Sequence, residues 1–237
     1  MMEIYALNKM PQLAVVTGSS SGIGLAITSL LIDQGWNILG VDRSLPSVDH
    51  ANYEHLILDL LNDDLIHESM KNIKADAFVH AAGFLKVANI GELDLNVGTE
   101  MWHLHTHAAA AITNQLINHM KSQSQGRIVY IGSRVSSGFP GRSQYAATKA
   151  ALVAMAKSWA AEVASSGITV NVVSPAATQT AMTNDPLRFS SQPKLPPIGR
   201  FIKPEEIAHL VAFLLSSSAA AITGQEITIC GGSSLNH

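Results

Sequence analysis

The sequence predicts a single α/β domain built on one doubly wound parallel sheet with helices on both faces. Short, mostly apolar, β-rich runs alternate with longer segments of helical period, which is typical of a parallel sheet buried between two layers of helices. The 237 residues suit one large domain, and 47% of them are apolar, enough for a sizeable core. Because no repeat or linker divides the chain, we expect one domain over residues 10–237, preceded by a loosely ordered leader at 1–9.

Each element follows from the local pattern. The gap between Val41 and His55 is too short for a crossover helix and two turns, so we expect that helix to be missing. Residues 183–199 hold four prolines and no helical period, which predicts a substrate lid or binding loop. The expected strands are 13–17, 36–41, 55–58, 77–80, 127–132, 168–173 and 226–229. The expected helices are a first one that ends near Gly35, and then 62–72, 99–122, 143–165 and 204–217.

Charge and cysteine content narrow the classes of function. A formal net charge of −3 and a pI near 6.3 offer nothing to nucleic acid or to an anionic membrane. No run approaches the roughly 18 apolar residues of a membrane span, and the first residues lack the basic and apolar regions of a signal peptide. The single cysteine, Cys230, excludes an intrachain disulfide framework and fits a reducing compartment. We therefore expect a cytoplasmic protein that acts on a small molecule.

The segment TGSSSGIG, residues 17–24, leaves the first strand and opens the first helix. Gly18 permits a tight turn, Gly22 allows the backbone to approach a pyrophosphate, and Gly24 permits close helix–strand contact. Backbone N–H groups at the helix start then face the phosphate charge. This strand–turn–helix context predicts a dinucleotide site of the Rossmann type. The other residues of the turn that we expect at the cofactor are Ser20, Ser21 and Ile23.

Acidic residues follow the second and third strands. Asp42 is placed to accept hydrogen bonds from the adenosine ribose, where it would repel a 2′-phosphate, so it favours NAD over NADP. Arg43 is read as a solvated turn residue, although it could instead partner a 2′-phosphate, and NADP is not excluded. Asp59 either meets the adenine amino group or caps the helix that follows.

Tyr145 and Lys149 lie four residues apart in the predicted helix 143–165 and therefore share one face. A phenol with a pKa near 10 is a poor base at neutral pH, and a neighbouring ammonium lowers that pKa. The pair can thus act as a general acid or base. Tyr5 and Lys9 have the same spacing but fall in the leader, outside any long helix, so we expect no chemistry from them.

Over residues 11–235 the chain resembles the short-chain dehydrogenase/reductase family. The resemblance rests on an ordered set of motifs rather than on any single one. They are TGSSSGIG (17–24), Asp59, AAG (81–83), IGS (131–133), YAATK (145–149), NVVSPAATQT (171–180) and ITGQEITICGG (222–232). The resemblance implies an NAD(P)-dependent oxidoreductase acting on CH–OH groups.

The resemblance also implies roles at matching positions. Tyr145 would exchange the proton with the substrate oxygen, and Ser133 would hydrogen-bond that oxygen. Lys149 would bind the nicotinamide ribose and lower the Tyr145 pKa. Thr180 would contact the carboxamide, beside the Ala177 backbone. The remaining implied cofactor contacts are Leu60, Ala81, Ala82, Gly83, Pro175 and Thr178.

Several positions depart from the family pattern. His80 stands where the family has asparagine, and His105 aligns with the catalytic asparagine of the long helix. A histidine at 105 is either a structural substitution or a participant in the proton relay, and we keep it among the catalytic candidates. Ser133 lies 12 residues before Tyr145 where 13 is commoner, but Ser136 and Ser137 are weaker substitutes because they fall beyond the strand end. Asn171 matches a position that supports the cleft without reacting.

The segment WHLHTH, residues 102–107, suggests a metal site only superficially. His103 and His107 share a helix face while His105 points away, and we see no acidic or cysteine ligand at useful spacing. We therefore expect no metal and treat these histidines as surface or interface residues.

The function favoured by these patterns is an NAD(H)-dependent oxidoreductase that interconverts a secondary alcohol and a ketone. A 3-oxoacyl thioester reductase using NADPH and a non-catalytic dinucleotide-binding protein of the same fold are the alternatives. The family's use of its long central helices as subunit interfaces implies a homotetramer or homodimer. A modest, partly apolar substrate is expected, with an anionic group meeting Arg134. The expected substrate-lining residues are Arg134, Phe139, Met182, Leu187 and Phe189.

Overall fold

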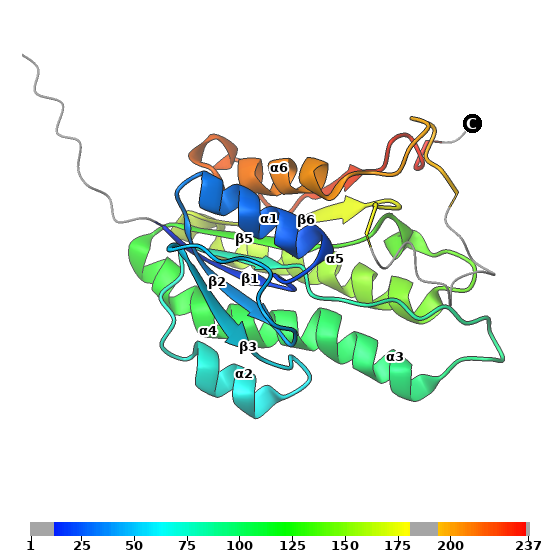
Figure 1. Ribbon diagram of the computed structural model, residues 1–237, viewed down its shortest axis with the longest axis horizontal. Helices are drawn as coiled ribbons and strands as arrows, with labels where there is room; N and C mark the ends of the chain where they lie inside the picture. The colour runs from blue at the N-terminus through cyan, green and yellow to red at the C-terminus, as the bar shows by residue number, and fades with distance from the viewer. Residues whose placement is uncertain (1–11, 181–193, 236–237) are drawn as a thin grey trace, which may run out of the picture.

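A computed structural model describes residues 12–180 and 194–235 of the chain (Figure 1). The expected leader at 1–9, with Tyr5 and Lys9, lies outside these residues. So does most of the expected substrate loop at 183–199, together with its candidates Met182, Leu187 and Phe189.

The centre of the molecule is one seven-stranded sheet in which all neighbouring strands are parallel. The strand order is β3-β2-β1-β4-β5-β6-β7. Strands β2 and β3 are added on one side of β1 and strands β4 to β7 on the other, so the order of addition reverses between β1 and β4. In such sheets a ligand binds at the carboxyl ends of the strands beside the reversal. The strands are β1 Leu13–Thr17, β2 Asn37–Asp42, β3 Tyr53–Ile57, β4 Ala77–His80, β5 Gly126–Ile131, β6 Ile168–Pro175 and β7 Glu226–Ile229.

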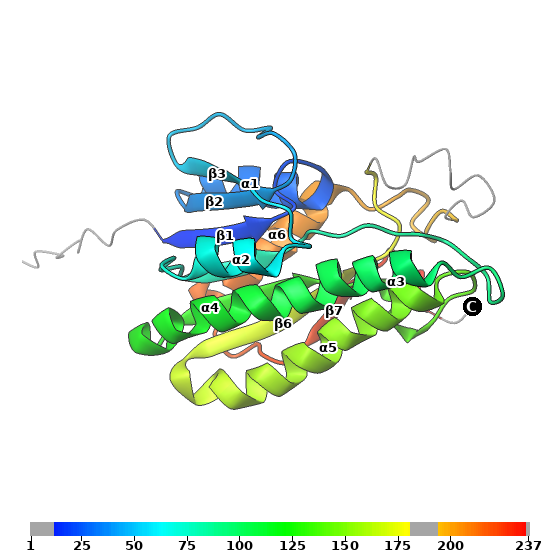
Figure 2. The same cartoon turned by 90° about the horizontal axis from the view of Figure 1, so that it is seen from below.

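Helices cover both faces of the sheet, which confirms the predicted fold class. On one face lie α1 and α6, and on the other lie α2, α3, α4 and α5; α3 continues the line of α4, with α5 running along the same face (Figures 1 and 2). The helices are α1 Gly22–Asp33, α2 Asp63–Met70, α3 Leu95–Trp102, α4 Ala108–Gln123, α5 Ser143–Val163 and α6 Pro204–Leu215.

Two apolar cores hold these layers together, one on each face. Ile27 of α1 and Val211 of α6 are fully buried against strand residues such as Val16. Ile112 of α4 and Leu152 of α5 are fully buried on the opposite face. Burying such side chains contributes about 1.5–3 kcal/mol each, so the cores fix the strands whose ends carry the site. No helix in the described part of the chain combines the length and the apolar character that crossing a membrane requires.

The segment between β2 and β3 holds no helix in the structure, as predicted from its length. The predicted helix 99–122 is wrong in its extent, because it starts earlier, as α3, and is interrupted by a π-helical turn at His103–His107. The helix expected from residue 143 does begin there, as α5, with Arg142 in the cap position. The local sequence did not indicate the π turn, because in this turn the Leu104 carbonyl pairs with His80 of β4, a distant element.

Candidate active site

A cavity of about 1050 Å³ opens at the carboxyl ends of the strands, next to the reversal between β1 and β4. The glycine turn, the ends of β2 and β4, the loop after β5, the start of α5 and the segment after β6 all border it. All the predicted catalytic and cofactor residues border this cavity except Ser20 and His105. The sequence-separated motifs therefore meet at one place.

The turn after β1 is shaped to receive a phosphate group closely. Gly18 has φ +70° and Gly22 has φ +54°, a region that side chains disfavour. A Cβ on Gly18 would stand 2.9 Å from the backbone of Ala82, and one on Gly24 would collide with the Gly18 carbonyl. The turn can thus keep this tight path only with glycine, and it opens directly into the N-terminus of α1, where unpaired N–H groups attract an anion. The residues present fit a dinucleotide pyrophosphate.

Asp42 braces this turn from the end of β2. One carboxylate oxygen accepts from the Ser20 N–H at 3.1 Å, and the other accepts from the Ser44 N–H at 2.9 Å. Ser20 itself is buried and is held against Asp42 by its backbone. Asp42 still borders the cavity, and each of its oxygens keeps a further lone pair. It can therefore hold the turn and accept from a ribose hydroxyl at once.

Arg43 and Asp59 complete the end of the cavity beside β2 and β3. Arg43 is exposed, which fits its reading as a solvated residue, although it also lies on the cavity rim. Asp59 accepts from the Leu61 N–H at 3.0 Å. It does not cap α2, because Asn62 is the cap and accepts from the Leu65 N–H. The capping alternative for Asp59 is therefore wrong.

Tyr145 and Lys149 both border the cavity from the first turns of α5. The Lys149 Nζ lies 5.8 Å from the centre of the Tyr145 ring, so the two groups face each other as their spacing predicts. Lys149 is 4% exposed, and its Nζ donates to the Ile131 carbonyl at 2.8 Å. Burial lowers the pKa of Lys149 to about 7, because the interior disfavours the ammonium. The protonation state of Lys149 therefore depends on the ligand or solvent in the cavity. Only the protonated form can stabilise a phenolate on Tyr145.

Ser133 ends the loop after β5 and also borders the cavity. Its hydroxyl accepts from the Val135 N–H at 3.4 Å, at the start of a 3₁₀ turn over Arg134–Ser137. Ser136 instead donates to Glu226 at 3.2 Å, and neither it nor Ser137 borders the cavity. Of the three serines, Ser133 is the one placed for a substrate oxygen.

His80, where the family pattern has asparagine, is fully buried and links Thr17 at the end of β1 to Leu104 in the π turn. The Thr17 hydroxyl accepts from the Ala81 and Ala82 N–H groups, so its own proton goes to His80 Nδ1 at 2.9 Å. His80 Nε2–H then donates to the Leu104 carbonyl at 3.0 Å. Burial is the main cause that lowers the pKa of His80 to about 3, which keeps the ring neutral.

The π turn makes this last contact available. In an α-helix the Ala108 N–H would donate to the Leu104 carbonyl, four residues earlier. Here it donates to His103, five residues earlier, and Leu104 accepts from His80 instead. The π turn is thereby hydrogen-bonded, through Leu104, to His80 at the end of β4.

His105 lies at the centre of the same turn and is fully buried, so the expectation of a surface or interface histidine is wrong at this position. The Phe84 N–H donates to its Nε2 at 3.1 Å, so the ring proton sits on Nδ1 and is donated to Thr148 at 2.8 Å. Thr148 in turn donates to the Tyr145 carbonyl at 2.8 Å. Burial, followed by the charge of Lys149, holds the pKa of His105 well below its usual range. The ring is a brace between the loop after β4 and the turn that carries Tyr145.

The structure adds Arg142 and part of the C-terminal segment to the residues expected at the cavity. Arg142 lies beside Phe139 at the cavity, with its guanidinium 4.9 Å from the ring centre, and Arg134 lies 5.8 Å from the same ring. Asn171, predicted to support the cleft, donates to the Ile222 carbonyl and accepts from the Gln225 N–H. The C-terminal segment also contributes to the lining, through Gly232, Ser233 and Leu235. Gly232 ends the motif ITGQEITICGG, whereas no motif signals this role for Ser233 and Leu235.

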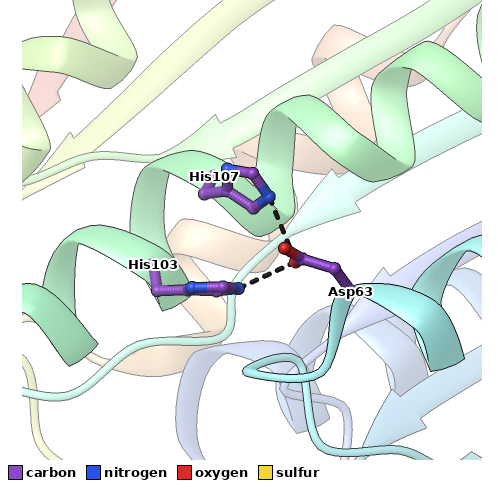
Figure 3. A group of neighbouring side chains, drawn as sticks. All are labelled: Asp63, His103 and His107. Carbon is purple, nitrogen blue, oxygen red and sulfur yellow. Dashed lines mark hydrogen bonds and ion pairs between the residues drawn. The ribbon is translucent and has the colours of Figure 1, made fainter.

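A second polar cluster, of one carboxylate and two histidines, lies outside this cavity. Asp63, at the start of α2, accepts from His103 Nε2 at 2.9 Å and lies 3.1 Å from His107 Nε2 (Figure 3). The statement that these histidines have no acidic residue near them is therefore wrong. The sequence hid the contact because 40 residues separate Asp63 from His103.

Comparisons with known proteins agree with this geometry. The family model described as Enoyl-(Acyl carrier protein) reductase matches residues 18–234. Among curated proteins, the 3-oxoacyl-[acyl-carrier-protein] reductase FabG of Vibrio cholerae is 33% identical over 95% of this chain and 98% of its own length. The protein of the same name from Escherichia coli is 35% identical over 93% of this chain and 96% of its own.

Solved structures share the fold closely. The aldohexose dehydrogenase of Thermoplasma acidophilum superposes with a TM-score of 0.86 at 26% identity, covering 96% of this chain and 95% of that one. A short chain dehydrogenase family protein from Francisella tularensis gives a TM-score of 0.86 at 26% identity, covering 95% of this chain and 100% of that one. These likenesses extend over nearly the whole length of the chain.

Proposed function

The chain belongs to the short-chain dehydrogenase/reductase family and is an oxidoreductase of CH–OH and carbonyl groups; we propose that it interconverts a secondary alcohol and a ketone with NAD(H). The observation that carries this proposal is the meeting of the Tyr145–Lys149 pair, Ser133 and the glycine turn around one cavity.

The proposed cofactor binding rests on the glycine turn after β1 and on Asp42 at the end of β2, both of which border the cavity. The glycine turn and the start of α1 would hold the pyrophosphate, and Asp42 would accept from the adenosine ribose. When bound, the nicotinamide supplies or accepts the hydride. A carboxylate at Asp42 opposes a 2′-phosphate, whereas exposed Arg43 would favour one. Because Asp42 is fixed by two hydrogen bonds and Arg43 is solvated, we favour NAD(H) over NADP(H).

The protein groups would handle the proton and the substrate oxygen. In the direction of reduction, the Tyr145 hydroxyl gives its proton to the carbonyl oxygen, and Ser133 donates a hydrogen bond that orients the same oxygen. Lys149 binds the nicotinamide ribose and, when charged, stabilises the phenolate left on Tyr145. In oxidation the proton moves back from the hydroxyl to Tyr145.

His105 takes the role of a positioning residue in this scheme. Its ring nitrogens are both committed, to the Phe84 N–H and to Thr148, and burial keeps the ring neutral. It therefore acts on Tyr145 through Thr148 and the start of α5. A direct part in the proton relay would require one of these two hydrogen bonds to break.

A 3-oxoacyl thioester is the substrate class that a specific observation favours. Relatives 33–35% identical to the chain are named 3-oxoacyl-[acyl-carrier-protein] reductases. In this chain, Arg134 at the cavity has a buried Nε that has no hydrogen-bond partner among the described residues, and Arg142 lies close by. A buried donor of this kind is costly unless a ligand accepts from it. An acyl thioester with a phosphate-bearing carrier arm would bring carbonyl and anionic acceptors.

One assay tests the proposal. Purified protein is mixed with NADH or NADPH and a panel of ketones and 3-oxoacyl thioesters, and the loss of reduced-nicotinamide absorbance is followed. We expect turnover with NADH, fastest with a 3-oxoacyl thioester, and weaker NADH binding by Asp42→Ala. A clear preference for NADPH in the wild-type protein would overturn the Asp42 argument, and no turnover of any panel member would favour the non-catalytic alternative.

Assembly and location belong to the same proposal. The small-residue faces of α4 and α5 suit subunit contacts, so a homodimer or homotetramer is expected, and light scattering coupled to size exclusion would measure it. The single cysteine, Cys230, fits a cytoplasmic setting.

A further inference from the structure

Two imidazole rings and a carboxylate converge on the surface between α2 and the π turn. The nitrogens of His103 and His107 and a carboxylate oxygen of Asp63 all lie within 4.8 Å of one another (Figure 3). The two ring centres are 4.7 Å apart, because residues four apart on a helix share one face. Both rings direct Nε2 at the same oxygen of Asp63. Three ligand atoms thus point at one small volume from two different helices.

The local folding leaves Asp63 available for this role. Asn62 caps α2, so the carboxylate of Asp63 is not needed to satisfy the N–H groups at the helix start. A carboxylate in the first turn is favoured by the helix dipole. A simple ion pair with Asp63 would need only one histidine, whereas two rings share a single oxygen here.

We propose that Asp63, His103 and His107 form a binding site for a transition-metal dication of the zinc class. Two imidazole nitrogens and one carboxylate oxygen are a recognised three-ligand set for Zn²⁺ and related ions, with water in the remaining positions. Ligand bonds of about 2.0–2.2 Å place tetrahedral ligand atoms roughly 3.3 Å apart. The present oxygen–nitrogen distances of 2.9 and 3.1 Å are close to that spacing. The metal would take the place of the hydrogen bond between His103 Nε2 and Asp63.

The chemistry of the ligands sets the choice of ion. Mg²⁺ and Ca²⁺ prefer oxygen ligands, so a set with two imidazoles discriminates against them. The side chains are 28–52% exposed, which leaves the site open to the ion and its waters. None of the three residues borders the cofactor cavity, so the ion would take no part in hydride transfer.

The consequence of binding would be a clamp on the π turn. The metal would tie α2 to both ends of the turn His103–His107, whose central residue His105 contacts the Phe84 N–H and Thr148. An ion that binds the folded state but not the unfolded state stabilises the folded state. The unfolding temperature should therefore rise with Zn²⁺ concentration.

The test is calorimetric titration of the tag-free, chelator-treated full chain with Zn²⁺. We expect one ion per chain with micromolar affinity, weakened at least about tenfold in Asp63→Asn, His103→Gln and His107→Gln. These side chains keep hydrogen-bonding capacity, so each variant should still fold, as circular dichroism would show. The rise in unfolding temperature with Zn²⁺ should be lost in the same variants, and millimolar Mg²⁺ should not compete.

Two control variants make the assignment specific. His119→Ala removes a partly exposed histidine of α4 outside the cluster, and Cys230→Ser removes the single thiol. Both should bind Zn²⁺ like the wild-type chain. The proposal is overturned if the wild-type chain does not bind Zn²⁺, if the three cluster variants bind it unchanged, or if either control loses binding to the same extent.

Discussion

Replacing Lys149 by Met should change how stability depends on pH, because the structure buries this ammonium without a carboxylate partner among the described residues. Lys149 is 4% exposed, its Nζ donates to the Ile131 carbonyl, and burial lowers its pKa from 10.5 to about 7. Below pH 7 the lysine holds its proton in both the folded and the unfolded state, and burial of the charge reduces stability in full. Between pH 7 and 10.5 the unfolded state binds a proton that the folded state has released, so the unfolding free energy rises with pH.

The size of the effect follows from the two pKa values. Each unit of pKa difference corresponds to about 1.36 kcal/mol. When the pH is raised from 6 to 9.5, the titration of Lys149 should therefore increase the unfolding free energy of the cofactor-free wild-type protein by about 3 kcal/mol. The Lys149→Met variant lacks this contribution. Because the quantity is a difference between two pH values, a constant packing effect of the methionine cancels.

The assay is urea unfolding of both proteins without cofactor at several pH values and one protein concentration. Lys157→Met is a matched control, since this exposed lysine lies on the same helix. Its curve should run parallel to that of the wild-type protein. If the Lys149→Met and wild-type stabilities also run parallel from pH 6 to pH 9.5, Lys149 is not the buried, uncompensated base described here.

Three further changes test other parts of the site. Gly24→Ala forces a Cβ against the Gly18 carbonyl, so NADH affinity measured by fluorescence should fall at least about tenfold; unchanged affinity would mean that the turn is not the cofactor cradle. His80→Leu leaves the buried Thr17 hydroxyl and the Leu104 carbonyl without their partner and should lower the urea-unfolding free energy by about 2–4 kcal/mol, whereas a loss under about 0.5 kcal/mol would refute its role as a link between them. Arg134→Leu should raise KM about tenfold for a 3-oxoacyl thioester and little for a neutral ketone, and an equal effect on both would contradict an anion-binding role.

The parts of the molecule governed by local patterns could be predicted from the sequence. The strand LAVVT at 13–17 and the strand EITI at 226–229 have the predicted bounds, since apolar runs between turn residues define both ends. The glycine turn and the Tyr145–Lys149 pair also lie together at one cavity, because fixed spacing in a turn or helix determines their direction.

The parts that depend on contacts between distant segments could not be predicted. The π turn arises where His80, from another element, takes the Leu104 carbonyl. The pairing of Asp63 with His103 and His107 depends on how α2 packs against the long helix. The burial of Lys149 is set by the whole sheet and α5 together. No sequence spacing encodes any of these relations.

The central claim is that Tyr145 exchanges a proton with the substrate oxygen while hydride is transferred. Tyr145→Phe removes only the hydroxyl, so the cavity and the cofactor cradle should remain. With the fastest substrate of the ketone and thioester panel, the account predicts turnover reduced at least about a hundredfold, with NADH affinity by fluorescence titration nearly unchanged. Turnover within a few fold of the wild-type rate would contradict it.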